Sequence, residues 1–533
     1  MYRLALTLII GTVSYWISGQ STFMQSFYGT GTAQAEINEL SSGNFRIGLA
    51  RQSGTSLFDP NGDILQSRNY AVDTFLVLQS IKRYTDNEFF FVGGYQRDSC
   101  SMFGEVSIPH TYPLIGRMDS LGNILNAQYY ILNSENCSNT AGDLEVMSDG
   151  GAIAWGIRHD RFYLLRVDNS GEPTWGKNYG TGGVFQFLKE LPSGDLLAGI
   201  NMMSAGAVVA RLDPSGNMLW CKSYIRPRGM VHDAVIVSDD TFYITGTTDS
   251  TALNLFTPLP FNYQPKLFLM NLNGMGEVQW CRGYDGMPNP WHSGSGSKIV
   301  NTHDGSFVVV ATLGEPDYNW FHSAVLMKLD TNGDTLWTRS VMHHGFNHYA
   351  KDLLATADGG YLYNGQIWGE LPVGQANFAF LYKTDADGHL PCIEHHHSIT
   401  IVDLFPVDSA ITLTSVDGAV PGPAFINETI YPPIDQYDGC DIMTNLPRTN
   451  ARGRSFNIRP NPNTGHFTVQ FPDPLQAESY YSVYDTMGKL LFQRRLPTGA
   501  TQEEVDLSGF SPGTYVLRFT DRDGVCYERV VLE

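Results

Sequence analysis

The chain has 533 residues, more than one ordinary domain core holds, and 42% of them are hydrophobic. Its 54 Gly, 27 Tyr and 29 Phe favour many short strands joined by tight turns, so we expect a β-rich protein. The formal net charge is -20, from 34 Lys and Arg against 54 Asp and Glu. A chain this acidic lacks the basic surface that nucleic acid or an anionic lipid surface would need, so neither is an expected partner.

The N-terminus predicts a secretory signal peptide over residues 1–19. Arg3 precedes an apolar stretch from Leu4 to Ile17, and the small residues Ser18 and Gly19 follow it. A membrane anchor is the less favoured interpretation, because a span needs about 20 apolar residues. We expect the signal to be removed and the mature form to have no transmembrane segment.

A repeat fills most of residues 20–397. Its core is an apolar run ending in Asp-x-x-Gly, with one Asn variant among seven copies: Asp59–Gly62, Asp119–Gly122, Asp168–Gly171, Asp213–Gly216, Asn273–Gly276, Asp330–Gly333 and Asp385–Gly388. Asp accepts hydrogen bonds from nearby backbone N–H groups and Gly tolerates a positive φ, so each copy predicts a hairpin. A second turn lies upstream of each copy. Seven units of four strands are typical of a seven-bladed β-propeller.

Aromatic residues recur at fixed distances from the hairpin glycines. Trp lies four residues after the Gly in four copies, and Tyr lies four residues further on in three of these: Trp175, Trp220, Trp280 and Trp337, with Tyr179, Tyr224 and Tyr284. Even offsets place both aromatics on one face of a strand. This constant position predicts that the Trp side chains pack between blades and do not form a sugar platform or a cofactor site.

The segment from Phe23 to Gly29 resembles the last strand of a repeat unit, but no turn precedes it. We expect it to complete the seventh blade, because this pairing joins the two ends of the ring and covers a strand edge. The phrases DGGY, LDxxGxxLW and YG resemble propeller-like repeats of bacterial secreted proteins. That resemblance implies a fold and leaves the ligand open.

Residues 398–454 lack the repeat and are rich in Pro and Thr, which predicts a linker or a small strand pair. Cys392 and Cys440 bracket this segment. A disulfide between them would fasten the linker to the chain leaving the ring, and two unrelated thiols are the alternative. The seven cysteines include no CxxC pair, so we expect no zinc site.

The last segment, residues 455–533, alternates apolar and polar residues over short strands, which predicts a small β-sandwich. Its phrases PNPNTGHF, VYDTMGKLL, VDLSGFSPGTYVLRF and RVVLE resemble, in order, the type A C-terminal sorting domain of the type IX secretion system. The residues carrying this motif are Pro460, Asn461, Pro462, Gly465, Asp485, Gly488, Lys489, Gly513 and Tyr515. The resemblance implies the type IX machinery as a partner. It also implies export through the periplasm to the outer surface of a Gram-negative bacterium or into the medium.

Catalytic and metal-binding patterns are not evident in the repeat. The histidines at positions 343, 344, 348 and 395–397 lack the spacing of metal ligands, so we expect them in loops. Gly294 to Ser297 precedes no helix of the kind that a serine-hydrolase elbow requires. We therefore expect no catalytic residue, no metal and no cofactor.

Ligand contacts are expected in loops outside the repeat, because aromatic residues in long loops on a rigid scaffold often mediate recognition. The candidates are Trp291, Trp320, Tyr263 and Tyr318. We expect a secreted or cell-surface binding protein of the adhesion type whose partner is an unidentified glycan or surface protein. One alternative is a propeller hydrolase or lyase acting on a glycan or peptide, and another is a structural surface component. An enzyme would bring titratable groups with shifted acidities together at the ring axis.

Overall fold

The computed structural model describes residues 22–28, 36–49, 54–71, 75–102, 106–131, 139–158, 161–202, 205–224, 229–249, 265–285, 298–315, 318–341, 346–371, 374–390, 399–406, 408–411, 413, 416–417, 420–423, 427–430, 436–438, 456–471, 474–475, 479–485, 490–521 and 524–532. The predicted signal peptide and the pair Cys392 and Cys440 lie outside these ranges. The described elements are all β-strands, so the predicted all-β fold class is confirmed.

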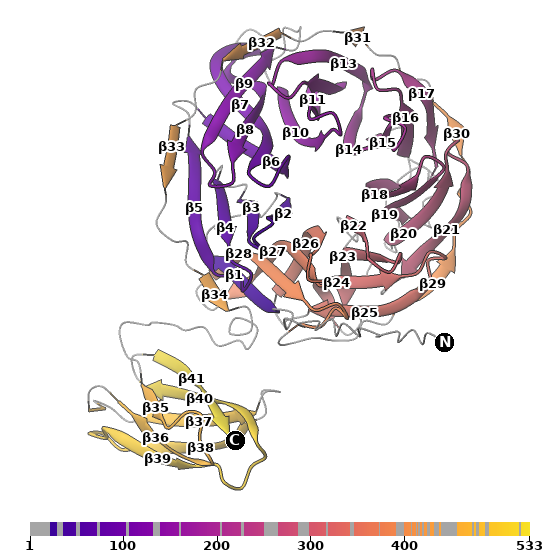
Figure 1. Cartoon of the computed structure of the whole chain (residues 1–533). Coiled ribbons are helices and arrows are strands. Elements are labelled where there is room, and N and C mark those ends of the chain that lie inside the picture. Colours follow the sequence, from indigo (N-terminus) through magenta and orange to yellow (C-terminus); the bar gives the residue numbers. More distant parts are fainter. Residues whose placement is uncertain are drawn as a thin grey trace, which may run out of the picture.

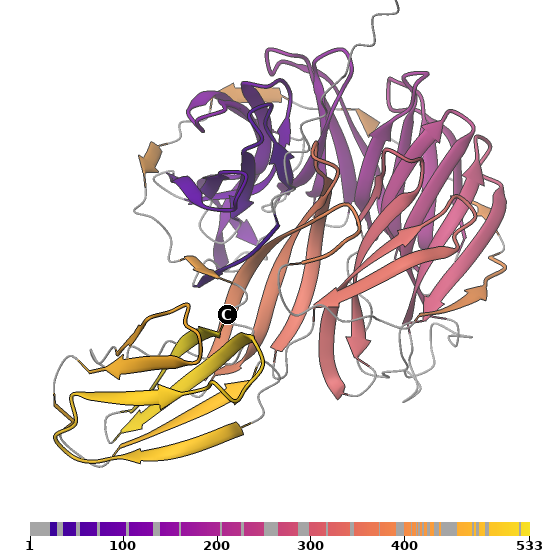
Figure 2. The same ribbon diagram turned by 60° about the horizontal axis from the view of Figure 1, so that its bottom comes forward.

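Seven antiparallel sheets stand around one axis in a ring (Figures 1 and 2), which confirms the propeller architecture. We number them as blades in chain order. Blade 1 comprises β2 (Ile37–Glu39), β3 (Phe45–Leu49), β4 (Gly54–Phe58) and β5 (Ile64–Ala71), and blade 2 comprises β6 (Phe75–Arg83), β7 (Glu88–Met102), β8 (Val106–Asp119) and β9 (Ile124–Ile131). Blade 3 comprises β10 (Asn139–Val146), β11 (Ala152–Arg158), β12 (Arg161–Val167) and β13 (Pro173–Thr181), and blade 4 comprises β14 (Gly183–Glu190), β15 (Leu196–Met202), β16 (Gly206–Leu212) and β17 (Met218–Ser223).

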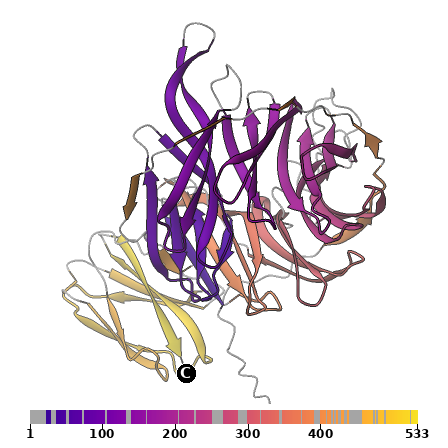
Figure 3. The ribbon, with the colours of Figure 1, turned by 45° about the horizontal axis from the view of Figure 1, so that its top comes forward.

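Blades 5 to 7 complete the ring. Blade 5 comprises β18 (Met230–Ser238), β19 (Thr241–Asp249), β20 (Pro265–Asn273) and β21 (Val278–Asp285). Blade 6 comprises β22 (Lys298–Asn301), β23 (Phe307–Glu315), β24 (Tyr318–Leu329) and β25 (Thr335–Val341). Blade 7 comprises β26 (Phe346–Ala355), β27 (Tyr361–Leu371), β28 (Gly374–Thr384) and, from the N-terminus, β1 (Phe23–Tyr28). The hairpin of β7 and β8 projects beyond the rim formed by the other blades (Figure 3).

Ring closure follows the sequence-based expectation. β1 pairs antiparallel with β28, from Phe23 opposite Lys383 to Tyr28 opposite Phe378. The first described strand is therefore the outer strand of the last blade, and the prediction for this orphan strand is confirmed. Its pairing joins the two ends of the repeat through backbone hydrogen bonds.

The Asp-x-x-Gly turns form as predicted. In the third copy the Gly171 N–H donates to the Asp168 carbonyl at 3.1 Å, and Asp168 Oδ1 accepts from the backbone N–H groups of Ser170 and Glu172 at 2.8 and 3.0 Å. The seven turn glycines have φ between +71° and +90°, a conformation that L side chains rarely adopt. The first six copies are therefore hairpins between the third and fourth strands of a blade, and the seventh is a turn that follows β28.

The repeated aromatic residues join each blade to the next, which confirms their predicted packing. Five tyrosine hydroxyls donate to the carbonyl of the turn glycine in the following blade, at 2.6 to 2.9 Å: Tyr70 to Gly122, Tyr130 to Gly171, Tyr179 to Gly216, Tyr224 to Gly276 and Tyr284 to Gly333. The indole N–H of Trp220 donates to the Gly274 carbonyl at 3.1 Å, in the same turn. A tyrosine thus binds the backbone of the next blade at each of these five junctions.

The described residues between 399 and 438 lie around the outside of the ring, and we call them the outer belt. Its short strands do not pair with each other among the described residues. Each adds a fifth strand to a different blade: β29 (Thr400–Asp403) to blade 5, β30 (Ser409–Ala410) to blade 4, β31 (Val416–Asp417) to blade 3, β32 (Val420–Pro423) to blade 2, β33 (Asn427–Ile430) to blade 1 and β34 (Gln436–Asp438) to blade 7. The belt covers outer strand edges, which otherwise favour aggregation.

Further backbone hydrogen bonds and side-chain contacts anchor the outer belt. The Leu404 and Ile411 N–H groups donate to the carbonyls of Cys281 and Cys221, each at 2.9 Å. Leu404 and Ile411 also pack against the apolar clusters of the blades, and Lys222 forms an ion pair with Asp408 at 3.0 Å. Cys221 and Cys281 are both buried free thiols.

The C-terminal unit has two sheets that share one apolar core (Figure 1). That core includes Phe467, Val483 and Leu517. One sheet has the order β35-β36-β39 and the other β38-β37-β40-β41, built from β35 (Asn457–Arg459), β36 (His466–Gln470), β37 (Ser479–Asp485), β38 (Leu490–Leu496), β39 (Gln502–Asp506), β40 (Gly513–Asp521) and β41 (Gly524–Leu532).

Candidate functional site at the ring axis

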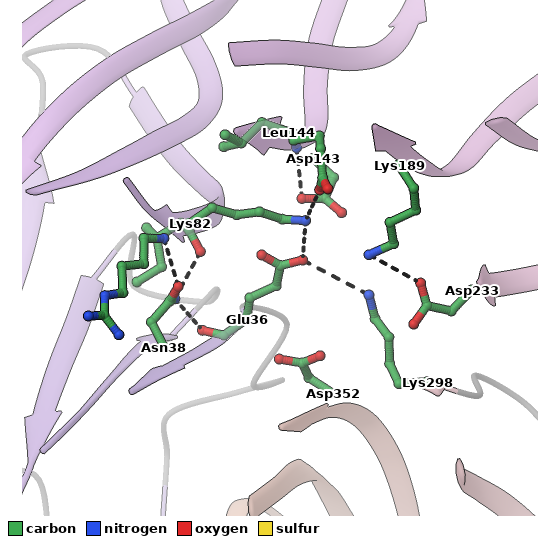
Figure 4. Close-up of polar contacts among 12 residues, drawn as sticks. Glu36, Asn38, Lys82, Asp143, Leu144, Lys189, Asp233, Lys298 and Asp352 are labelled. Atoms are coloured by element: carbon green, nitrogen blue, oxygen red, sulfur yellow. Dashed lines mark hydrogen bonds and ion pairs between the residues drawn. The ribbon is translucent and has the colours of Figure 1, made fainter. Parts of the chain in front are cut away.

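The first strand of each blade lies nearest the axis (Figure 1). Along such a strand, alternate residues point to opposite faces. In β10, Leu144 belongs to the apolar core between blades, whereas its neighbours Asp143 and Glu145 carry charge. The same alternation brings charged side chains from all seven blades together. We call this set the axis cluster: Glu36, Lys82, Asp143, Glu145, Lys189, Asp233, Lys298 and Asp352. Figure 4 labels all of them except Glu145.

Backbone irregularities accompany these positions. The register of the inner strand shifts in five blades, between Leu78 and Ser80, Ala141 and Asp143, Phe185 and Phe187, Val231 and Asp233, and Ala350 and Asp352. Such bulges bend a strand and change the direction of neighbouring side chains. Three carboxylates of the axis cluster directly follow a bulged residue.

Ion pairs connect the blades across the axis. The ammonium group of Lys82 lies 3.0 Å from Glu36 and 2.9 Å from Glu145, which joins blades 1, 2 and 3. Lys298 lies 4.0 Å from Glu36, and Lys189 lies 3.7 Å from Asp233 Oδ1. These last two separations exceed hydrogen-bond length. Lys82 is therefore fully engaged, whereas the other two ammonium groups stand near carboxylates without bonding to them.

Two carboxylates also bind the backbone of the next blade. Asp352 Oδ2 accepts from the Ile37 N–H at 2.7 Å, and Asp233 Oδ2 accepts from the Ile299 N–H at 3.2 Å. Asp233 is only 3% exposed, and its other oxygen, Oδ1, has no hydrogen-bond partner. An unpaired oxygen on a buried carboxylate is costly in a folded protein, which marks this atom as a position prepared for a donor.

The pKa values diverge within the cluster. Burial, reinforced by Asp143, raises the pKa of Glu36 to about 8, and the two nearby lysines only partly offset this. Burial also raises the pKa of Asp352. For Asp233, burial is outweighed by Lys298 and Lys189, so its pKa is lowered. One cluster thus holds a carboxylate that stays ionised and another that takes up a proton near neutral pH.

The lysine ammonium groups stay charged. Burial opposes the charge on Lys82 and Lys298, but the facing carboxylates outweigh burial and raise both pKa values. Next to Asp233, burial lowers the pKa of His232 to about 4, so this imidazole is neutral at physiological pH. Its Nε2 lies 3.2 Å from Thr247 Oγ1.

The aromatic residues predicted to bind ligand stay a prediction. Tyr263 and Trp291 lie outside the described residues. Tyr318 and Trp320 lie in β24, where the structure describes only their backbone. His348, which we expected in a loop, is fully buried in β26 beside Phe380 and Tyr382, because it occupies an inward position of that strand.

The axis cluster was missed by the sequence analysis, although a signal for it exists. The upstream turn of six blades opens at Leu40, Tyr84, Met147, Leu191, Thr302 and Thr356. Seven of the eight cluster residues lie two or four positions before these residues: Glu36, Lys82, Asp143, Glu145, Lys189, Lys298 and Asp352. If the inner strands are aligned on their turns, charged residues recur at these two positions, where a strand buried on both faces would have apolar residues.

The sorting-motif residues form a clamp in the C-terminal unit. The amide side chain of Asn461 donates to the Arg529 carbonyl at 2.6 Å and accepts from the Val531 N–H at 2.8 Å. Asn463 adds a bond to the Val531 carbonyl at 3.0 Å. Asn461 and Asn463, which follow Pro460 and Pro462, therefore hold the start of the domain against its last strand, β41. Pro460 and Pro462 both follow cis peptide bonds.

The remaining motif residues lie in or beside these strands. Gly465 has φ of +107°, and a Cβ there would lie 2.7 Å from the Ser508 backbone. Tyr515 of β40 pairs with Asp485 of β37, and its hydroxyl donates to the Ser511 carbonyl at 2.5 Å. Gly513 opens β40, whereas Gly488 and Lys489 fall outside the described part of the chain.

Residues 457–533 match the family model described as the secretion system C-terminal sorting domain. The chain therefore carries a type IX sorting domain, and its destination is the outer cell surface or the medium of a Gram-negative bacterium. This confirms the recognition made from the motifs and places the type IX machinery among its partners. No curated protein sequence matches the chain. Within the described residues, no helix is both long and apolar enough to cross a membrane.

Solved structures resemble the chain only weakly. A streptogramin B lyase is 11% identical with a TM-score of 0.41, covering 68% of this chain and 98% of its own. A protein of unknown function from Bacteroides caccae is 11% identical with a TM-score of 0.34, covering 60% and 93%. A member of the DUF4221 family from Bacteroides vulgatus is 9% identical with a TM-score of 0.31, covering 72% and 97%. Likeness at this level says nothing about activity.

Proposed function

We propose that this exported propeller is a binding protein, secreted or held at the cell surface, whose ligand contacts the axis cluster. The observation that carries this proposal is the unpaired Asp233 Oδ1 beside the ammonium groups of Lys189 and Lys298. These charged groups converge from three blades but do not satisfy one another. A polar ligand would supply the missing hydrogen bonds.

Ring stability alone does not account for this arrangement. The blades are already joined by the tyrosine bonds to turn glycines and by Asn38, which bonds to Ile81 and Arg83 of blade 2 at 3.0 and 2.8 Å. Replacing a buried ion pair by apolar residues is often neutral or stabilising, so such groups are weak contributors to stability. Their convergence at the axis is better explained by recognition.

The test is a glycan and surface-protein array screen of the mature chain, followed by variants of the retained ligand. Asp233→Asn should weaken binding about tenfold or more, the cost of losing one charge-assisted contact. Lys177→Met, on the outer strand β13, is the matched control and should bind like the wild type. Absence of any ligand in the screen would contradict the proposal.

Loop variants locate the site. We proposed Trp291 and Trp320, with Tyr263 and Tyr318, as contacts on one face of the ring. Trp291→Ala and Trp320→Ala should leave binding unchanged if the axis cluster holds the ligand. Loss of binding in these variants, with Asp233→Asn unaffected, would move the site to the loops and keep the function as a binding protein.

A hydrolase acting on a glycan or peptide is the second candidate. The divergent pKa values of Glu36 and Asp233, two members of the axis cluster, favour it, because carboxyl groups with separated acidities serve as acid and base in many hydrolases. Chromogenic glycoside and peptide substrates assayed from pH 5 to 9 would test this. Turnover that is lost in Glu36→Gln would establish an enzyme, and no turnover across the series would exclude this candidate for those substrates.

A further inference from the structure

We propose that the axis cluster binds a primary ammonium group, which donates a hydrogen bond to Asp233 Oδ1. This inference rests on the proposed function and names the chemical class of its ligand. The ammonium group belongs either to a free alkylamine or to the lysine side chain of a polypeptide. Both sources present the same compact cation with three N–H donors.

Asp233 is a suitable acceptor because it is fixed, buried and ionised. The Ile299 N–H holds Oδ2 at 3.2 Å, so the carboxylate has a defined orientation. Oδ1 has no hydrogen-bond partner, and the nearest ammonium nitrogen, on Lys189, is 3.7 Å away. The lowered pKa of Asp233 keeps it negatively charged at neutral pH. A donor that reaches Oδ1 would satisfy a buried carboxylate oxygen that lacks a hydrogen-bond partner.

The charge balance of the cluster selects a cation over an anion. With Glu36 protonated, the axis cluster has four other carboxyl groups, Asp143, Glu145, Asp233 and Asp352, against three lysines. An anionic ligand would add to this excess of negative groups, whereas an ammonium group would reduce it. Lys82 shows the arrangement that an ammonium group takes here, because it lies between Glu36 and Glu145 at 3.0 and 2.9 Å.

Glu36 couples this binding to pH. The charged groups that face it are Lys82 of β6, Asp143 of β10, Lys298 of β22 and Asp352 of β26. The negative neighbours and burial favour its protonated form. An added cation favours the ionised form, so ammonium binding should release a proton from Glu36 and strengthen as pH rises toward 8.5.

The experiment is calorimetric titration of the mature full chain with two probes, cadaverine and Nα-acetyl-lysine methylamide. Both should bind saturably, and Asp233→Asn should weaken binding by about tenfold or more, as expected for a lost charged contact. Tighter binding of the lysine probe would identify a polypeptide ligand, and tighter binding of cadaverine a free amine. Asp408→Asn in the outer belt is the matched control and should leave the affinity unchanged.

A second variant keeps the test decisive if Asp233→Asn fails to fold. Wild-type affinity should rise roughly tenfold between pH 6.5 and 8.5 with proton release, as linkage to a group of raised pKa requires, and Glu36→Gln should abolish that rise. The inference is overturned if neither amine binds, if hexanoate or calcium binds more tightly than both amines, or if all variants bind equally. A ligand found in the array screen without any amine binding would refute this inference alone and leave the proposed function standing.

Discussion

A turn can need glycine because its φ is positive or because no space exists for a Cβ atom, and Gly305 and Gly333 allow these two effects to be compared. Both lie in blade 6 with φ of +79°. A Cβ at Gly305 would meet nothing within 4 Å, whereas one at Gly333 would lie 2.8 Å from the Tyr284 hydroxyl and 2.9 Å from the Trp280 ring. Gly305→Ala should therefore cost only the left-handed backbone penalty, about 1–2 kcal/mol.

We expect Gly333→Ala to lower the free energy of unfolding by about 1–3 kcal/mol more, because the new methyl group also displaces the residues that join blades 5 and 6. Denaturant unfolding of the two variants and the wild type measures this difference directly. Equal losses in the two variants would mean that the contact of Tyr284 with the next blade adds nothing to stability.

Glu36 makes stability depend on pH. Its pKa is about 8 in the folded protein against an ordinary value of 4.5, so the folded state favours the protonated carboxyl. The stability contributed by Glu36 is complete below about pH 4.5 and is lost as pH rises through 8. A Glu36→Gln variant cannot ionise. Its melting temperature relative to the wild type should increase from pH 5 to pH 8.5, and a difference independent of pH would contradict the raised pKa.

Side-chain roles divide clearly between those that the sequence revealed and those that it did not. The Trp and Tyr positions were predictable because they recur at a constant distance from a turn. Asp233 was not, because its importance arises from Ile299 of another blade and from Lys189 of a third. Residue spacing reports contacts within a repeat, and the axis cluster consists of contacts between repeats.

At the level of elements, β1 decides whether the ring closes. It pairs on one side with β28 and on the other with β34 of the outer belt. Deleting residues 22–28 exposes both edges and removes Phe23 and Met24 from the core. We expect a sharply lower melting temperature and a tendency to aggregate. Deleting residues 20 and 21 alone is the control, and an unchanged melting point in the longer deletion would refute this closure.

The outer belt gives a matched pair of truncations. A chain ending at Ser398 lacks both the belt and the sorting domain, whereas a chain ending at Gly453 lacks only the sorting domain. The first exposes the outer edges of six blades and should melt earlier and aggregate, while the second should keep the melting temperature of the propeller. If the two truncations melt alike, the belt contributes nothing to the ring.

The belt strands could not be predicted, whereas the blades could. Each blade strand has a hairpin partner next to it in sequence and a turn with recognisable chemistry. Belt strands are two to four residues long, and their partners lie far away in the sequence. For example, Asn427 of β33 pairs with Ala71 of β5. Such short segments have little β-preference of their own, and their structure comes from the edges that they cover.

The whole molecule consists of a ring, the belt around it, and a separate sorting domain that follows them in the sequence. Belt strands meet the blades in reverse order, from blade 5 through blade 1 to blade 7, and the last of them, β34, pairs with β1. Both ends of the propeller region are thus fixed in the same sheet. The sorting domain has its own apolar core, so removing it need not disturb the ring.

Export should therefore be separable from folding. A chain ending at Gly453 retains β34, which ends at Asp438, and lacks all residues that match the sorting domain. We expect it to fold and to remain in the periplasm, because nothing directs it to the type IX machinery. Cell fractionation with the full chain as control measures its location, and protease resistance checks its fold. Appearance of the folded truncated protein at the cell surface would show that the signal for export lies in the propeller itself.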